Sequence, residues 1–364
     1  MAQTVIPFGD PKAVKRWSAD LAVDVRKKSY FEARFIGTSE NSVIQRKTEL
    51  ESDAGDTIDF DLSVHLRGKP TYGDARVEGK EENLRFFSDK VMIDQVRHSV
   101  SAGGRMSRKR TIHNIRRIAR DRLGDYFYKF TDELLFIYLS GARGINLDFI
   151  ETPDFQGFAG NPLQAPDSEH ILYGGVATSK ASLVATDIMS PLVIERAMER
   201  AAMMQAEHPE TANMVPSTVE GEDHYVCVMS EYSATDLRTS AGGSWIDFQK
   251  AAAAAVGNNS PIFKGGLGMI NNVVLHKHRN AIRFSDYGAG ANIPASRALF
   301  MGRQAGVIAY GTANGMRFDW EETVKDYGNE PAIAAGFIAG IKKAQFNNKD
   351  FGVISIDVAA NKHS

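Results

Sequence analysis

The sequence predicts an α+β protein, and two patterns carry this prediction. From Thr57 to Leu66 apolar and polar residues alternate without a break, which is typical of a half-buried β-strand. From about 108 to 140 apolar residues recur mostly at every third or fourth position, as they do along one face of an α-helix. Shorter apolar stretches of both kinds follow between about 187 and 358. The chain therefore combines long strands and one long helix with a second, mixed body.

The composition is that of an ordinary globular protein. The 364 residues are 43% hydrophobic and 24% charged, which excludes a disordered or a fibrous chain. At roughly 100–200 residues per domain, this length suggests about two or three domains. The 43 Lys and Arg residues nearly balance the 45 Asp and Glu residues, giving a formal net charge of −2. Binding of nucleic acid through bulk positive charge is therefore excluded, and any DNA contact must come from a local patch.

Two absences bear on the compartment. Cys227 is the single cysteine, so no intrachain disulfide can form, which fits a reducing environment. The N-terminal residues lack the basic start, apolar stretch and cleavage site of a secretory signal. No run of about 18 apolar residues occurs, so no membrane-spanning helix is expected. We expect a soluble chain that is made in a cytoplasm and has no membrane partner.

The first 42 residues have the pattern of an extended arm with one short helix. Val14, Trp17, Leu21 and Val25 recur at helical spacing within residues 14–34. Such a helix could cap the core of its own domain, or it could lie on a neighbouring subunit. The sequence favours neither of the two.

A long hairpin follows the arm. Residues 43–50 predict a strand, residues 53–56 a turn, and residues 84–100 a returning strand after a polar loop. A further strand, residues 57–66, is predicted between the turn and the polar loop. One of its faces is apolar, and the other carries Asp59 and Asp61. A two-stranded ribbon is marginally stable alone in water, so the apolar face needs the chain's own core or the next subunit. The apolar residues of this face are Ile58, Phe60, Leu62, Val64 and Leu66.

The helix predicted for about 108–140 would be on the order of 50 Å long, at 1.5 Å per residue. Gly141 and Gly144 are expected to end it. A helix of this length usually serves as the spine of a fold. Beyond it, residues 145–180 have an irregular pattern. Helices are predicted for 191–207 and 245–256, strands for 225–230, 272–277 and 351–358, strands or tight helices for 299–310, and a loop for 257–268.

No motif of a catalytic or cofactor site is evident. The phosphate-binding loop and the nucleophile elbow are absent, and Gly265–Gly268 lacks the dinucleotide-binding spacing. We interpret His276 and His278 as exposed residues of an edge strand, since further metal ligands are not evident nearby. Cys227 is interpreted as part of the core. We therefore expect no catalytic residue, no metal and no cofactor.

Charge is distributed unevenly along the chain. Six acids and no Lys or Arg lie between Glu49 and Asp61, whereas the segment 105–122 contains one acid, Asp121. Cations near the start of a helix oppose its dipole, so the basic segment needs an anion. This anion could be the acidic hairpin of this or a neighbouring subunit, or the phosphate of nucleic acid; a merely solvated face is the third alternative. The basic residues are Arg105, Arg108, Lys109, Arg110, Arg116, Arg117, Arg120 and Arg122.

The order of these elements, together with a set of short sequence matches, resembles a known family. The matches span nearly the whole chain, and their order and spacing are more specific than any one of them. The sequence resembles the major capsid proteins of tailed double-stranded DNA bacteriophages, and within them the family typified by the coliphage N-four. The matching residues are Arg46–Leu50, Gly55–Ile58, Glu81–Leu84, Val91–Val100, Asp132–Leu134, Asp236–Leu237, Trp245, Gln249–Ala252, Asn259–Met269, Leu299–Ala305, Asp326–Asn329, Gly340–Lys343, Phe346 and Asp350–Val353.

The resemblance implies the Hong Kong ninety-seven type fold and its layout. Residues 1–48 would form the N-terminal arm and residues 49–90 the extended β loop that overlies a neighbour. The peripheral domain would comprise residues 91–185, with the long spine helix, and residues 315–364. Residues 186–314 would form the axial domain, which meets its copies around five-fold and six-fold axes.

The resemblance also implies a function. The chain would be a structural subunit, without enzymatic activity, of the icosahedral phage head. It would assemble into pentamers and hexamers, in the host cytoplasm, to form a shell around packaged double-stranded DNA. Portal, scaffold and decoration proteins are further candidate partners. Lys69 and Lys80 lie where some relatives form a covalent crosslink, but no motif assigns a partner to them, and we predict no crosslink.

Two sets of residues are the expected contact sites. On the extended loop they are Ile58, Asp59, Phe60, Asp61, Leu62, Val64 and Tyr72, expected at a subunit interface. In the basic segment they are Arg108, Lys109, Arg110, Arg116, Arg117 and Arg120, expected at a subunit interface or facing DNA. One alternative is a soluble α/β enzyme without a local sequence signature, in which His224, His276 and His278 would be the candidate residues. A weaker alternative is a DNA-binding regulator that uses the basic segment.

Overall fold

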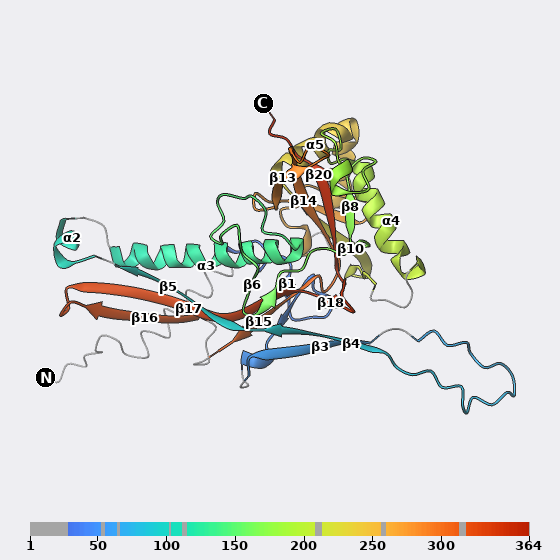
Figure 1. The fold of residues 1–364 in the computed structure, drawn as a ribbon, viewed down its shortest axis with the longest axis horizontal. Helices are drawn as coiled ribbons and strands as arrows, with labels where there is room; N and C mark the ends of the chain where they lie inside the picture. Colours follow the sequence, from blue (N-terminus) through green and yellow to red (C-terminus); the bar gives the residue numbers. More distant parts are fainter. Residues whose placement is uncertain are drawn as a thin grey trace.

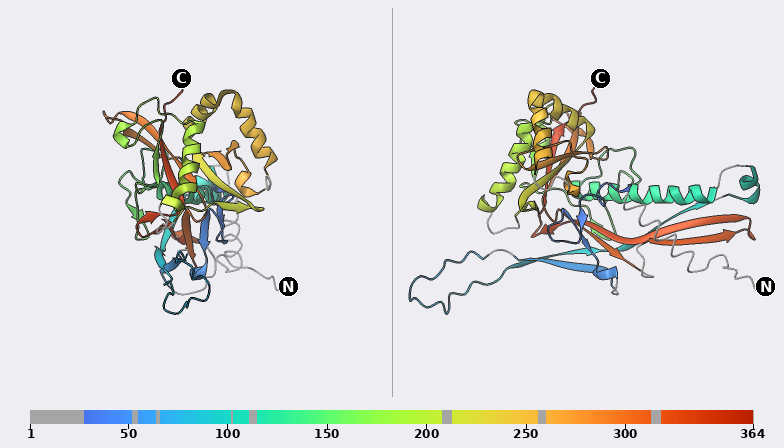
Figure 2. Two further views of the ribbon diagram at one scale, coloured as in Figure 1. Left: turned by 90° about the vertical axis from the view of Figure 1, so that its right-hand side faces the viewer. Right: turned by 180° about the vertical axis from the view of Figure 1, so that it is seen from behind.

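The computed structural model describes residues 28–51, 55–63, 66–101, 103–110, 115–207, 213–255, 260–312 and 318–363. An upright body stands on a long, flat lower layer (Figure 1). The lower layer extends to both sides of this body, with a helix and a β-hairpin on one side and a thin ribbon on the other, as the view from behind also shows (Figure 2). In the described part of the chain, no helix combines the length and the apolar character needed to cross a membrane.

The upright body is built on an eight-stranded sheet. Its strands follow the order β11 (Gly268–Ile270), β12 (Val273–Lys277), β10 (Glu222–Met229), β14 (Ile293–Met301), β20 (Val353–Ala359) and β8 (Ile171–Tyr173), with β13 (Arg283–Tyr287) paired to β14 and β9 (Ser217–Val219) paired to β10. The helices of this body are α4 (Pro191–Glu207), α5 (Glu231–Ala241) and α6 (Trp245–Ala254).

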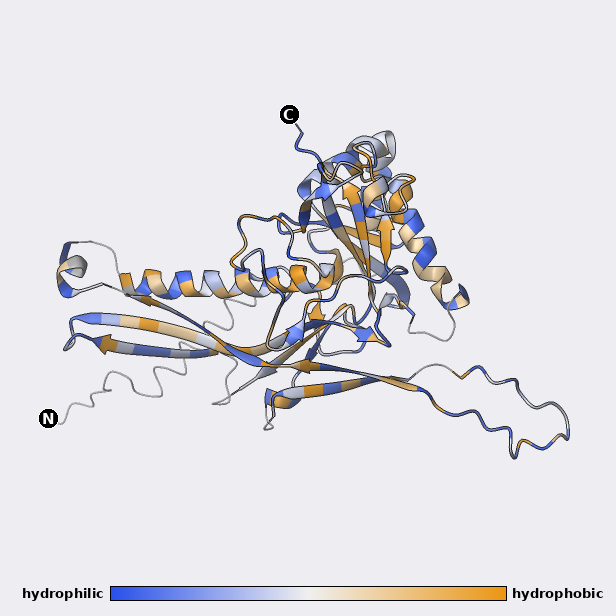
Figure 3. Ribbon diagram, viewed as in Figure 1, coloured by the Kyte–Doolittle hydropathy of each residue, from blue (hydrophilic) through white to orange (hydrophobic). Residues whose placement is uncertain are grey.

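Both faces of this sheet are covered. Along β10, Cys227 packs with Ile194 of α4, whereas Val226 and Val228 belong to a second cluster on the opposite face, together with residues of the long helix. The central strands are therefore almost continuously apolar, as strands covered on both faces are. Figure 3 shows this, since the strands of the upright body are mostly coloured hydrophobic. Cys227 is fully buried, and burial raises the pKa of its thiol to about 12, which confirms its interpretation as core.

The lower layer contains a six-stranded sheet and the long helix α3 (Ile115–Ser140). The strand order is β1 (Ile36–Gly37), β2 (Ile44–Lys47), β15 (Gly306–Gly311), β17 (Glu330–Lys343) and β16 (Phe318–Lys325), and β5 (Asp94–Ser101) also pairs with β17. Aromatic side chains join the helix to the sheet: the ring of Phe127 lies 5.5 Å from that of Phe337 and 5.9 Å from that of Phe318, in edge-to-face contacts.

The long helix ends where the sequence predicted. Gly141 follows α3 with a φ of +66°, in the left-handed region. A Cβ atom at this position would lie 2.1 Å from the carbonyl oxygen of Gln164, so both backbone conformation and space require glycine. At its start the predicted helix is divided into α2 (Arg105–Arg110) and α3, with residues 111–114 outside the described part.

A buried ion pair connects α3 to the upright sheet. Arg297 of β14 donates from Nε and Nη2 to the two carboxylate oxygens of Asp357 in β20, at 2.6 and 2.7 Å. Its Nη1 donates to the carbonyl oxygen of Ser140, the last residue of α3, at 2.7 Å. The hydroxyl of Tyr287 donates to Asp357 at 2.6 Å. One guanidinium thus joins two strands and neutralises the negative end of the helix dipole.

Several predicted elements are confirmed, and others differ. The helix α4 and strands β10, β12 and β20 lie where expected. Most of the helix predicted for residues 14–34 lies outside the described residues, and of its last residues Tyr30 and Phe31 are buried in the chain's own core. Helix α5 and the long strands β16 and β17 were not predicted. The other short elements are β6 (Gly157–Phe158), β7 (Asn161–Pro162), β18 (Gln345–Phe346), β19 (Lys349–Asp350) and the 3-10 turns Glu49–Glu51, Lys180–Ser182, Gly242–Ser244 and Pro261–Phe263.

Strand pairing divides the chain differently from the expected domain ranges at several places. β1 and β2 fall within the range 1–48 expected for the arm, but they belong to the six-stranded sheet. β8 falls within the range 91–185 expected for the peripheral domain, but it belongs to the eight-stranded sheet. β15 falls within the range 186–314 expected for the axial domain, but it pairs with β2 and β17 in the six-stranded sheet. β20 falls within the range 315–364 expected for the peripheral domain, but it pairs with β14 and β8 in the eight-stranded sheet. The chain therefore crosses between the two sheets between β5 and β8, near residues 302–305 and again near residue 352.

We predict that Asp357→Ala lowers the free energy of unfolding by about 3–5 kcal/mol, because Arg297 would remain buried without its counter-charge. Denaturant unfolding monitored by circular dichroism measures the change. As a control, Asp286→Ala removes an exposed partner of Lys180 and should cost less than about 1 kcal/mol. Similar losses in the two variants would contradict the role of the buried pair.

Candidate interaction surfaces

The extended loop is a two-stranded ribbon that projects from the lower layer. β3 (Thr57–Ser63) pairs antiparallel with β4 (Phe86–Met92), with Ile58 opposite Val91 and Ser63 opposite Phe86. Residues 66–85 continue outward without regular secondary structure, away from both sheets (Figure 1). The predicted hairpin is thus present in β3 and β4, whereas the second half of the predicted returning strand, β5, pairs with β17 instead. Val64 lies outside the described residues.

The apolar face of the ribbon packs on the chain's own core near its base. Ile58 is buried, and the ring of Phe60 makes an edge-to-face contact with Phe346 at 5.9 Å. Leu62 is partly buried in the same cluster, which also contains Val91. The sequence allowed this face to pack on the chain's own core or on the next subunit. These residues contact the chain's own core. Asp59 and Asp61 face the other way and are exposed.

Polar contacts fix the base of the ribbon. The ammonium group of Lys342 pairs with the carboxylate of Asp89, and both side chains are about 10% exposed. The side-chain amide of Asn161 replaces a neighbouring strand, since it accepts from the N–H of Met92 at 2.9 Å and donates to its carbonyl oxygen at 2.7 Å. Tyr138 of α3 in turn donates to the carbonyl oxygen of Asn161 at 2.8 Å. The ribbon therefore leaves the molecule in a fixed direction.

One carboxylate joins the two sides of the loop beyond the ribbon. Glu82 accepts hydrogen bonds from the backbone N–H groups of Arg67 and Gly68, and these bonds lower the pKa of its carboxyl. Tyr72 is 71% exposed. Figure 3 shows hydrophobic residues interspersed in the mostly hydrophilic loop. The exposed large apolar side chains of this region are Leu66, Tyr72, Val77, Leu84 and Phe86.

The basic segment forms the far end of the lower layer. Lys109, Arg110 and Arg117 are exposed, and Arg120 is half-buried beside Asp121 at 3.7 Å. Arg108 lies in α2 and Arg116 in α3, but their side chains are outside the described part. The first turn of each of these helices contains no acid. The structure thus gathers the predicted cations at one end of α3. We call this region, α2 with the first turns of α3, the basic end.

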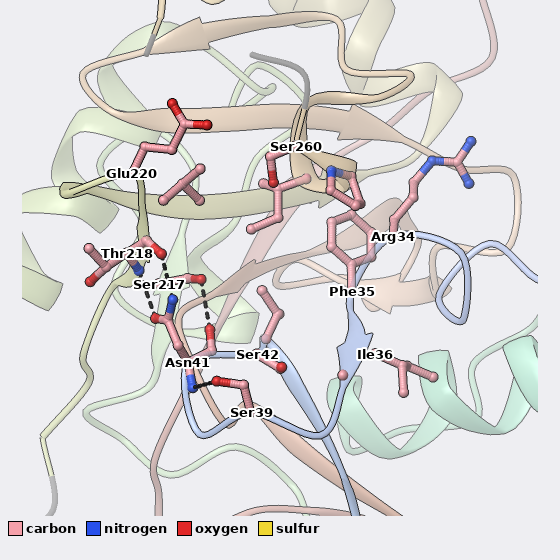
Figure 4. A pocket seen from close by; sticks show the side chains of 15 residues that line it. Arg34, Phe35, Ile36, Ser39, Asn41, Ser42, Ser217, Thr218, Glu220 and Ser260 are labelled. Atoms are coloured by element: carbon pink, nitrogen blue, oxygen red, sulfur yellow. Dashed lines mark hydrogen bonds between the residues drawn. The ribbon is translucent and has the colours of Figure 1, made fainter. Parts of the chain in front are cut away.

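A hollow of about 410 Å³ lies between residues 34–43, β9 and residues 260–262 (Figure 4). On one side Asn41 accepts from the N–H of Thr218 at 2.7 Å and donates to its carbonyl oxygen. Ser217 donates to the carbonyl oxygen of Asn41 at 2.8 Å. Arg34, at the other side, donates to the carbonyl oxygen of Lys264 at 2.9 Å. These groups tie the segment after the arm to the upright body; they do not form an acid–base or nucleophile pair.

The histidines are structural, and their interpretation as exposed residues of an edge strand was wrong. β12 lies between β11 and β10, and His276 is 1% exposed because its face is covered by Tyr30 and Phe35. Its Nε2 lies 2.7 Å from the carbonyl oxygen of Ile262. His278 is half-buried and stacks on Phe136 at 5.0 Å. Among the described residues, no cluster of three or more His, Cys, Asp or Glu side chains could hold a metal ion.

A comparison with known protein families identifies the family of this chain. A family model described as "Phage capsid protein" matches residues 5–362. The chain belongs to this family. A major capsid protein of Pseudomonas phage KPP25 is 28% identical over 374 residues, which cover 94% of each chain.

Solved structures agree with the family assignment. A chain from the capsid of Ralstonia phage GP4 is 70% identical and matches this capsid protein over 100% of both chains, with a TM-score of 0.89. A chain from the capsid of cyanophage Pam1 shares the fold at 20% identity, over 93% and 94% of the two chains, with a TM-score of 0.71. The predicted α+β fold of the Hong Kong ninety-seven type is confirmed.

This capsid protein is therefore a structural subunit of the icosahedral phage head shell, and the head is where it resides. At this level the family assigns a structural role rather than an enzymatic one.

The residues that orient the ribbon, Lys342 and Asn161, were missed by sequence reasoning. Asn161 stands between Gly160 and Pro162, so the sequence signals a turn there but not its contact with Met92.

The residues that follow the arm are held by one buried carboxylate. Asp132 of α3 accepts from the hydroxyl of Ser29 at 2.7 Å and from the backbone N–H groups of Tyr30 and Phe31 at 2.8 and 3.2 Å. Burial raises the pKa of Asp132 to about 6. The Asp132–Leu134 segment was among the sequence matches, but its contact with Ser29 depends on the fold.

Two histidines cover the other side of this segment. The rings of Tyr30 and His278 are 4.5 Å apart, and burial lowers the pKa of both His276 and His278 to about 4. The unfolded chain, in which a histidine has a pKa of about 6.5, binds more protons than the folded chain between these values. The stability that the two histidines contribute is therefore lost as the pH falls from about 6.5 to about 4. Asp132 acts in the opposite sense, because its raised pKa favours the folded state as the pH falls through 6.

We predict that His278→Phe reduces the loss of stability between pH 6.5 and pH 4.5, because Phe keeps the stack on Phe136 and removes one proton-binding group of the unfolded chain. Denaturant unfolding at several pH values measures this slope. His98→Phe, at an exposed histidine stacked on Tyr126, is the matched control. An unchanged slope in His278→Phe would show that His278 does not contribute to the acid sensitivity.

Proposed function

We propose that this capsid protein forms its shell through the extended loop, residues 49–90, which lies on a neighbouring copy and links copies within pentamers and hexamers. The fixed direction of the ribbon supports this role, because Lys342 and Asn161 hold its base while its outer residues contact no core. The exposed side chains of Tyr72, Leu84 and Phe86 supply apolar area that only another molecule can cover. A contact of this kind is heterologous and closes into rings.

The two sheets correspond to the two proposed domains. The six-stranded sheet with α3 would form the peripheral domain, and the eight-stranded sheet with α4, α5 and α6 would form the axial domain around the five-fold and six-fold axes. Relative to the ranges expected from the sequence, β15 would join the peripheral domain, and β8 and β20 would join the axial domain, because strand pairing is the stronger criterion. By the same criterion β1 and β2, which fall in the range 1–48 expected for the arm, would join the peripheral domain.

The particle would enclose double-stranded DNA and would be assembled in the host cytoplasm. Net charge supports an enclosing role, since a chain of formal charge −2 does not bind DNA strongly along its whole surface. The basic end of α3 is the local exception. Its anion in the particle would be either DNA phosphate or acids of a neighbouring copy. Portal, scaffold and decoration proteins would complete the head.

We predict that Tyr72→Asp blocks assembly while leaving the melting temperature of the unassembled subunit unchanged, because Tyr72 contacts no core. Phe60→Asp should also block assembly, but it should lower that melting temperature by several degrees, since it removes the contact with Phe346 and buries a charge. Electron microscopy counts the particles, and differential scanning fluorimetry gives the melting temperatures. Normal particles from Tyr72→Asp would contradict the proposed role of the loop.

The basic end is tested separately. We predict that replacing Lys109, Arg110 and Arg117 together by Glu weakens assembly, and that the defect changes with salt because exposed charges are screened. Sedimentation at 50 and 500 mM NaCl measures assembly, and nuclease protection measures the DNA retained. Replacing the three residues by Gln is the control that removes charge without reversing it and should give a smaller defect. Unchanged assembly together with unchanged DNA retention would dismiss both candidate anions.

A further inference from the structure

The loop after α3, residues 142–151, is built around one buried cation. Arg143 is 7% exposed, and its guanidinium donates to the carbonyl oxygens of Asn146 and Glu151, at 3.0 Å and at 2.7–3.0 Å. The same group lies over the ring of Phe149, 4.7 Å from its centre. A single side chain thus holds three points of the loop.

Neighbouring elements fasten the same loop from outside. Both carboxylate oxygens of Glu133 accept backbone N–H groups, those of Ile150 and Glu151, at 2.7 Å each. The side-chain amide of Asn146 donates to the carbonyl oxygen of Ala281 at 3.1 Å and accepts from the N–H of Arg283 at 3.0 Å. These bonds leave the loop little freedom, so a partner that contacts it need not order it first.

This rigid loop presents apolar side chains to solvent. Leu147, between the fixed residues Asn146 and Phe149, is 97% exposed, and Ile145 and Ile150 are 49% and 39% exposed. Burial of a fully exposed leucine against another molecule stabilises the contact, because it removes apolar surface from water. We propose that it is a docking surface for a second copy of this chain, namely for the basic end of that copy's α3.

Charge complementarity identifies this occupant. Between Arg143 and Lys180 the chain has five acids and no Lys or Arg, and three of these acids, Asp148, Glu151 and Asp154, lie in or next to the loop. The basic end has the opposite charge and has exposed apolar side chains of its own, Met106 and Ile118, at 62% and 44%. An apolar centre with an anionic rim thus fits an apolar centre with a cationic rim.

The two surfaces cannot meet within one chain. They lie at opposite ends of α3, which has 26 residues and is therefore about 39 Å long. Figure 1 shows α2 at one end of this helix and the upright body at the other. Contact between them must be heterologous, between different copies, which is the kind of contact that a shell requires. The inference rests on the proposed assembly. It identifies the acids of the loop after α3, on a neighbouring copy, as the counter-charge of the basic end in the shell.

Assembly of the full chain tests the apolar part. Leu147→Ser should raise the subunit concentration needed for assembly at least tenfold without changing the melting temperature of the unassembled subunit. Leu147→Met is the matched control, because it keeps an apolar side chain of similar size at the same position and should assemble like the wild type. Assembly of Leu147→Ser at the wild-type concentration would overturn the inference.

Charge exchange tests the partner. Asp148→Lys with Asp154→Lys should impair assembly, as should Lys109→Glu with Arg110→Glu, and the four changes together should restore it. Restoration supports a direct contact between the two surfaces. If the basic-end variant instead loses DNA and the combination restores nothing, DNA is the anion and the inference fails. The proposed function of the extended loop is tested independently by Tyr72→Asp, so the two failures can be distinguished.

Discussion

Arg297 shares its guanidinium among the carboxylate of Asp357, the phenol oxygen of Tyr287 and the last carbonyl oxygen of α3. Arg297 and Asp357 are almost completely buried, so each would carry a large desolvation cost without the other. The pair thereby sets where the long helix meets the upright sheet. Because α3 also carries the aromatic residues that pack on β17, the position of the whole lower layer relative to the upright body depends on this contact.

The two exposed parts of the capsid protein are fixed by the same physical device, a buried polar group that satisfies backbone N–H and C=O groups of another segment. Asn161 does this for the ribbon at Met92, and Arg143 with Glu133 does it for the loop after α3. Backbone groups without partners are costly when they are buried, so these bonds hold each segment in one position. The exposed apolar side chains beyond them are thus presented in defined directions, which suits contacts that must repeat identically around a shell.

Elements with a strong period could be predicted from the sequence. The alternation around Ile58 gave β3, and helical spacing with Gly141 gave most of α3 and its end. Strand β17 was missed because it alternates small residues such as Ala334 and Gly336 with larger ones, and small residues carry little apolar signal. Strand β16 was missed although its Phe318 and Trp320 alternate with acidic residues. The histidines were misplaced because the neighbours of β12 in the sheet, and the cover that Tyr30 provides, come from distant parts of the chain.

The sequence by itself determined the class of elements, the unequal distribution of charge and, through its resemblance to capsid proteins, the family. These properties depend on residue type and local spacing, which can be read directly from the sequence. Only the tertiary structure decided which apolar residues are available to a neighbour. Ile58 and Leu147 look equally apolar in the sequence, yet Ile58 is buried against Val91 whereas Leu147 is exposed on a loop held by Arg143. Burial is a property of what lies beside a residue in space, and those neighbours are brought there by sheet pairing between segments far apart in the chain.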